Sequence, residues 1–316
     1  MAEVQPASAP VRGIALKCAS VAIFSVMAAA VKAAQAEVPA GEAVFFRAFL
    51  ALPVVVAYAW ARGRLAAATS TRNLRAHAIR GVIGAAGMGV SFTALGLLPL
   101  PEVIAIGFAA PLLATVMAVF LLGEVVRAYR WSAVFIGLIG VIVMIWPRLT
   151  VLRDGFGSDL EAIGTITALV AAFLMALAQI HVRWLARTEP VLAIVFWFHV
   201  SCSLGALLTL PFGWVWPSAE VWLLLIVSGV FGGTAQIFLT ESYRHADAST
   251  VAPFDYTSMI YGLLIGYFIF GEAPEVAVLL GASIVIGAGL FILWRERQLG
   301  ILAERKEARR AMPPQG

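Results

Sequence analysis

The residues that could do chemistry in this sequence are few, and they lie inside long apolar runs. Asp255 and Tyr256 interrupt the run from Ser249 to Glu272, and Arg47 lies in FFRAFL within a second run. An ionisable side chain in an apolar span is costly unless it faces protein, water or a ligand. These positions are therefore candidates for a site that binds a small polar molecule.

Asp255 has two interpretations, which depend on its depth in the run. At 100° per residue Asp255, Ser258 and Gly262 share one helix face, and Tyr261 lies on another. The segment could line a cavity that contacts a substrate and a proton. Alternatively, Asp255 caps the first turn of the helix, where the helix dipole favours a carboxylate. Asp255 lies about six residues into the run, roughly 9 Å by helical rise, and this depth favours the cavity.

Arg47 and His199 are the other notable polar residues within apolar runs. Arg47 could face a central cavity and pair with Glu102 or a substrate carboxylate, or its long stem could carry the charge to the membrane interface; both interpretations stay open. His199, in FWFHVSCS, could couple transport to a proton because an imidazole titrates near neutral pH. It could equally be a packed core residue. Gln236 is a further polar position inside a run.

The composition defines the class of protein. Of the 316 residues 61% are hydrophobic and 13% are charged, whereas soluble domains have roughly 25% charged residues. So few charges indicate an all-α integral membrane protein. Ten runs have about the length that crosses ~30 Å of hydrocarbon, so we predict ten transmembrane helices near residues 13–32, 42–60, 79–98, 102–122, 131–147, 160–182, 191–210, 220–240, 249–270 and 276–294.

The basic residues predict the orientation. They concentrate in the loops after the even-numbered spans and in the C-terminal tail, whereas the opposite loops have only Lys32, Arg148 and Arg153. Cytoplasmic loops carry the excess of Lys and Arg, so both termini are predicted to be cytoplasmic. No basic patch interleaved with aromatic residues lies outside the predicted spans, so we expect no nucleic-acid partner.

The chain repeats itself at a nearly constant offset. Gly81, Gly84, Gly123-Glu124 and Trp146 recur 148 residues later as Gly229, Gly232, Gly271-Glu272 and Trp294, and Val31-Lys32 recurs 151 residues later as Val182-Arg183. Because five is odd, two five-helix halves enter the membrane from opposite sides, and such inverted repeats place a substrate site between them near the midplane. We predict a disordered N-terminal tail (1–10), a first repeat (11–150), a second repeat (158–295) and a basic C-terminal tail (296–316).

The repeated glycines and glutamates suggest structural roles. The glycine-rich stretches 81–89 and 229–233 have the small-residue spacing that lets helices approach closely. Glu124 and Glu272 each follow a glycine that can end a helix in the left-handed conformation. We interpret both glutamates as boundary residues that bond to a neighbouring helix. His199 lies one position past the repeat equivalent of Arg47, which supports a shared wall facing a cavity.

Three stretches carry a resemblance to a known family: FFRAFLALP at 45–53, APLLATVMAVFLLGE at 110–124 and APFDYTSMIYGLLIGYFIFGE at 252–272. Together they resemble the EamA-type branch of the drug/metabolite transporter superfamily over residues 13–295. The resemblance implies a multi-pass protein of the bacterial inner membrane that carries small organic metabolites by alternating access. Met259 replaces a proline of the general pattern, and the Pro-Phe-Asp-Tyr form is similar to a subgroup of S-adenosylmethionine and riboflavin transporters.

Other classes of function fit less well. An enzyme would need a nucleophile–base pair or metal ligands, and the four histidines are scattered without ligand spacing, so we expect no enzymatic activity, cofactor or metal. A broad multidrug exporter and a channel stay as alternatives. The expected partners are a small-molecule substrate and the lipid bilayer, with a proton as candidate coupling ion and a monomer or homodimer as the assembly. The candidate substrate-binding residues are Asp255, Tyr256, Ser258, Tyr261, Arg47, His199, Gln236 and Glu102.

Overall fold

A computed structural model describes residues 10–71, 73–122, 127–151, 160–186, 188–246 and 248–311. All the regular secondary structure in these ranges is helical. Nine of the described helical stretches are long and apolar enough to cross a membrane, which confirms the all-α membrane class. Of the tail expected to be disordered, residues 1–10, Pro10 instead begins α1. Residues 1–9 and Glu124 lie outside the described residues.

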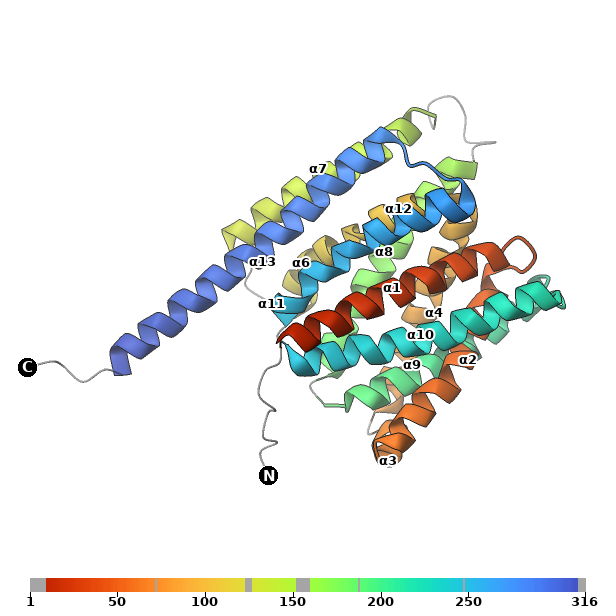
Figure 1. Cartoon of the computed structure of the whole chain (residues 1–316), viewed down its shortest axis with the longest axis horizontal. Helices are drawn as coiled ribbons and strands as arrows, with labels where there is room; N and C mark the ends of the chain where they lie inside the picture. Colours follow the sequence, from red (N-terminus) through yellow and green to blue (C-terminus); the bar gives the residue numbers. More distant parts are fainter. Residues whose placement is uncertain are drawn as a thin grey trace, which may run out of the picture.

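The helices follow one another closely along the chain (Figure 1). The first half contains α1 (Pro10–Ala34), α2 (Ala40–Ala61), the short α3 (Leu65–Thr69), α4 (Leu74–Leu97), α5 (Leu100–Gly107), α6 (Ala109–Leu122) and α7 (Ala128–Val151). The second half contains α8 (Leu160–Leu185), α9 (Val191–Ala206), the 3₁₀ turn η1 (Leu207–Phe212), α10 (Ala219–His245), α11 (Ala248–Val251), the 3₁₀ turn η2 (Ala252–Tyr256), α12 (Thr257–Phe270) and α13 (Val276–Ala311).

The ninth predicted span is broken, which is why the described chain has nine long spans instead of ten. Residues 248–270 divide into α11, η2 and α12. Pro253 lies in η2, and a proline has no N–H to donate and its ring crowds the preceding turn. The fourth span has a milder break at Phe108, between α5 and α6, and still counts as one span over Leu100–Leu121. Pro111 lies four residues after Gly107 and cannot donate to its carbonyl.

The two halves make equivalent contacts with their roles exchanged. Helix α1 packs on α10 as α8 packs on α4, and α2 packs on α10 as α9 packs on α4. The corresponding helices α7 and α13 pair with each other along one edge of the bundle (Figure 1). Gly81 of α4 contacts Ser201 of α9, and its counterpart Gly229 of α10 contacts Leu50 of α2. This exchange is the arrangement expected of an inverted repeat.

The interior contains small and aliphatic side chains, and the outside is strongly apolar. One buried cluster includes Val31, Leu95 and Leu225 from α1, α4 and α10. A second includes Met144 and Val285 from α7 and α13. Large apolar side chains are exposed along the spans, among them Phe120, Phe135, Leu223 and Phe268. An apolar exterior of this kind suits a lipid environment.

The close approach at Gly81 predicts a stability difference between two substitutions in α4. A Cβ at Gly81 would overlap Ser201, whereas a Cβ at Gly89 has no atom within 4 Å. Gly81→Ala should therefore lower stability by about 1–3 kcal/mol through overpacking. Gly89→Ala should be neutral or stabilising, because alanine is the better helix former. Thermal unfolding of the two purified variants measures the difference, and equal melting temperatures would contradict the packing.

Candidate functional site

The two broken spans meet at an aromatic pair. Phe108 lies between α5 and α6, and Tyr256 is the last residue of η2, directly before α12. Their ring centroids are 5.2 Å apart with an edge-to-face angle of 69°. The two positions are separated by 148 residues, the offset of the repeat. Broken helices commonly form the binding sites of transporters built from inverted repeats. The predicted residue Tyr256 therefore belongs to the contact between the two halves.

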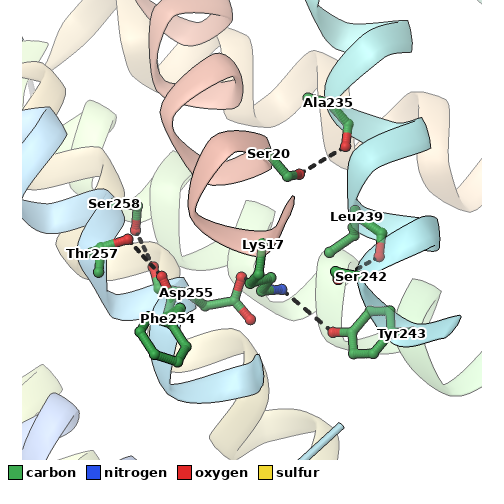
Figure 2. Close-up of polar contacts among 10 residues, drawn as sticks. All are labelled: Lys17, Ser20, Ala235, Leu239, Ser242, Tyr243, Phe254, Asp255, Thr257 and Ser258. Carbon is green, nitrogen blue, oxygen red and sulfur yellow. Dashed lines mark hydrogen bonds and ion pairs between the residues drawn. The ribbon is translucent and has the colours of Figure 1, made fainter. Parts of the chain in front are cut away.

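Asp255 pairs with Lys17, a residue that the sequence analysis did not select (Figure 2). The distance from Lys17 Nζ to Asp255 Oδ1 is 2.7 Å, and the Lys17 side chain is 1% exposed whereas that of Asp255 is 51% exposed. Lys17 also donates to Tyr243 Oη at 3.4 Å. The pair joins α1, α10 and η2, and Asp255 supplies the countercharge for a buried ammonium group.

The hydroxyl groups beside Asp255 satisfy the local backbone. Ser258 Oγ donates to the Asp255 carbonyl at 2.7 Å and Thr257 Oγ1 donates to the Phe254 carbonyl at 2.6 Å, as Figure 2 shows. No side-chain cap bond forms at the start of η2 or α12. Asp255 lies in the first turn of η2, two residues before α12 begins, and not six residues inside a continuous helix as expected; its carboxylate faces Lys17.

A second lysine of α1 binds the far end of α12. Lys32 Nζ lies 2.9 Å from Glu272 Oε1 and donates to the carbonyls of Leu95 and Leu98 at 2.9 and 2.6 Å. Glu272 Oε2 accepts from the Leu100 N–H at 2.8 Å. Gly271 ends α12 with φ of +67°, the left-handed turn predicted there. Glu272 therefore has the predicted boundary role, and it joins α1, α5 and α12.

Arg47 is buried between helices of both halves. It is 6% exposed, which argues against the snorkelling alternative. Its Nη1 contacts Met88 Sδ of α4 at 3.6 Å, and its Nε lies 3.1 Å from the position that a Cβ of Gly232 in α10 would occupy. The Nε is shielded from solvent and has no hydrogen-bond partner among the described residues.

Arg80 and His199 lie in the same region as Arg47. Arg80 of α4 stacks over the Phe198 ring of α9 at 4.2 Å from the centroid. Its Nε and Nη1 are buried and unpartnered within the described chain, as are both ring nitrogens of the fully buried His199. His199 follows Phe198 on α9, and α9 packs against both α2, which carries Arg47, and α4, which carries Arg80. Arg80 is the second residue of the predicted span 79–98, so the sequence placed it at a span edge, whereas α4 begins six residues earlier, at Leu74.

The repeat explains how these residues come together. Phe198 is the repeat equivalent of Arg47, and Gly84 is that of Gly232. Arg47 of the first half packs on Gly232 of the second, and Phe198 of the second half packs on Gly84 of the first, where Arg80 also lies. A glycine at each position gives the space for these large side chains. The alignment of the repeats was the signal that could have identified Arg80.

The remaining predicted residues lie on other parts of the bundle. Glu102 is buried in the first turn of α5, Gln236 is half-buried in α10 and Tyr261 is half-buried in α12. The structure thus buries Arg47 and His199 on α2 and α9, two helices that pack against each other. Of the predicted residues around η2 only Asp255 contacts Lys17, whereas Tyr256 faces Phe108 and Ser258 bonds to the Asp255 carbonyl. In the described ranges no group of three or more His, Cys, Asp or Glu side chains gathers as metal ligands would.

The EamA-like transporter family model matches residues 11–146 and 162–294. The chain belongs to the EamA-like transporter family. This confirms the resemblance inferred from the three motifs, and with the apolar helices it identifies a multi-pass membrane protein. A solved crystal structure aligns with a TM-score of 0.64 at 21% identity, over 91% of this chain and 98% of the other, and shows the same fold.

The curated relatives of this protein are named for the transport of different molecules. It is 30% identical to the S-adenosylmethionine uptake transporter of Rickettsia prowazekii, over 80% of this chain and 81% of the relative. It is 28% identical to the riboflavin transporter of Brucella anthropi, over 72% and 78%. It is 27% identical to the pseudopaline exporter of Pseudomonas aeruginosa, over 87% and 94%. The relatives include both an uptake protein and an exporter.

Proposed function

We propose that this EamA-family protein is a secondary transporter that moves a small organic metabolite across the bacterial inner membrane by alternating access. The observation that carries the proposal is the burial of Arg47 and His199 where α2 of one half meets α9 of the other. The family match supports it over both halves. The relatives are named for the transport of S-adenosylmethionine, riboflavin and pseudopaline, which supports a metabolite as cargo. All three are named as transporters and none as an enzyme.

The moving parts would be the two repeats, residues 11–150 and 158–295. Lys17 and Lys32 bind the two ends of the α12 segment, through Asp255 and Glu272. Residues 17 and 32 are roughly 22 Å apart along α1 by helical rise, so the two ion pairs lie near opposite membrane faces. In an alternating-access cycle the two pairs would open in turn. Both termini would be cytoplasmic by the distribution of basic residues, and a proton is the candidate coupling ion.

Replacing Arg47 should abolish most of the transport. Loss of a charge-assisted hydrogen bond is worth about 1.5–3 kcal/mol, which corresponds to roughly tenfold to a hundredfold in affinity. We therefore expect Arg47→Ala to reduce counterflow of S-adenosylmethionine or riboflavin into reconstituted vesicles by at least about tenfold. The matched control is Arg62→Ala, at the exposed end of the same helix. Equal counterflow by both variants would place the site elsewhere.

A further inference from the structure

We infer that Arg47, Arg80 and His199 form a buried site for an anionic group of the transported metabolite. The inference rests on the proposed function and specifies the chemical class of its cargo. The group would be a carboxylate or a phosphate, because both present the oxygen atoms that guanidinium groups bind in pairs.

The first reason is the balance of charge. Burying a charge costs a large free energy unless an opposite charge compensates it. The other internal cations of the described chain have such partners: Lys17 has Asp255 and Lys32 has Glu272. Arg47 has a methionine sulfur as its partner and Arg80 has the Phe198 ring. The two arginines therefore lack a carboxylate within the described chain, and a bound anion would supply it.

The second reason is the set of unused donors. Arg47 Nε, Arg80 Nε and Arg80 Nη1 each carry a hydrogen and are shielded from solvent without a partner in the described chain. A neutral imidazole carries one N–H, so His199 adds a further donor, since neither of its nitrogens is bonded within the described ranges. Buried donors are almost always satisfied in folded proteins. An anionic group with several acceptor oxygens would satisfy these donors together.

The third reason is position. Arg47 lies seven residues after the start of α2, Arg80 six residues after the start of α4 and His199 eight residues after the start of α9. These separations correspond to roughly 9–12 Å along each helix axis. Helices α2 and α4 are antiparallel in the predicted topology, so their arginines enter from opposite ends toward the middle of the membrane. A midplane site between the halves is where inverted-repeat transporters bind their cargo.

Two measurements on the ligand-free protein test the charge argument. If Arg47 and Arg80 have no internal countercharge, Arg47→Met and Arg80→Met should leave the melting temperature unchanged or raise it, because an apolar replacement removes an uncompensated buried charge. Lys32→Met, which removes a paired lysine, is the control and should lower it. A fall in both arginine variants as large as that of the control would overturn the inference.

Matched ligands test the anion directly and separate its two sources. S-adenosylmethionine differs from its decarboxylated analogue by a carboxylate, and flavin mononucleotide differs from riboflavin by a phosphate. A ligand stabilises the folded state that binds it, so we expect the member of one pair that carries the carboxylate or phosphate to raise the melting temperature more than the member that lacks it. The difference should disappear in Arg80→Met. The pair that shows the difference identifies the group as a carboxylate or a phosphate.

The outcomes also distinguish this inference from the proposed function. Counterflow of the carboxylate- or phosphate-bearing member of each pair at the same rate in the wild type and in Arg80→Met would overturn the anion site and leave the transporter standing. Charge-selective binding without counterflow would support the anion site and overturn the transport proposal.

Discussion

Asp255→Asn should lower the free energy of unfolding by more than is usual for the substitution of a half-exposed carboxylate. It leaves the Lys17 ammonium, 1% exposed, without its countercharge. Breaking a buried ion pair from one side costs about 3–5 kcal/mol, and because half of the Asp255 side chain is exposed we expect roughly 2 kcal/mol after allowing for solvent screening. The melting temperature of the purified protein should fall by about 4–8 °C.

A double substitution separates stability from substrate binding at this position. Lys17→Met combined with Asp255→Asn removes the stranded charge, so the melting temperature should return close to that of the wild type. If Asp255 serves only the ion pair, counterflow should recover with stability. If Asp255 also contacts the substrate, counterflow should stay low in the stable double variant. A double variant that melts as low as Asp255→Asn would show that the pair is not the cause.

Lys32→Met should produce the other large loss of stability. Lys32 Nζ pairs with Glu272 and donates to the Leu95 and Leu98 carbonyls at the C-terminal end of α4. Because the Lys32 side chain is only 13% exposed, water cannot readily replace these contacts when it is removed. Unsatisfied buried acceptors cost about 1–3 kcal/mol, and the orphaned carboxylate adds to this cost. We expect about 3 kcal/mol in total, measured as a fall in melting temperature.

Glu272→Gln is the matched change on the other side of this contact. The amide oxygen can still accept from the Leu100 N–H, and Lys32 keeps its bonds to the Leu95 and Leu98 carbonyls. Glu272→Gln should therefore lower the melting temperature by less than Lys32→Met does. The reverse order would mean that the helix-end carbonyls contribute little.

The division of the chain into spans follows from the sequence because it depends on local properties. The length of each apolar run is set by the thickness of the hydrocarbon, and the runs match the described helices closely. The glycine offsets likewise predicted where helices approach, as at Gly81 and Gly229. The ninth span differs because Pro253 acts through backbone hydrogen bonding, whereas a count of apolar residues does not register a missing N–H.

The partners of the charged residues were decided only by the tertiary structure. Asp255 and Lys17 are separated by 238 residues, and their contact needs α1 and η2 to be neighbours. Arg80 looks like a residue at a span edge, yet its side chain reaches Gly84 and Phe198. Depth along a helix can be counted from the sequence. The direction of a side chain depends on which helix lies beside it, so the sequence determined that charges lie within the membrane and the packing determined which of them are paired.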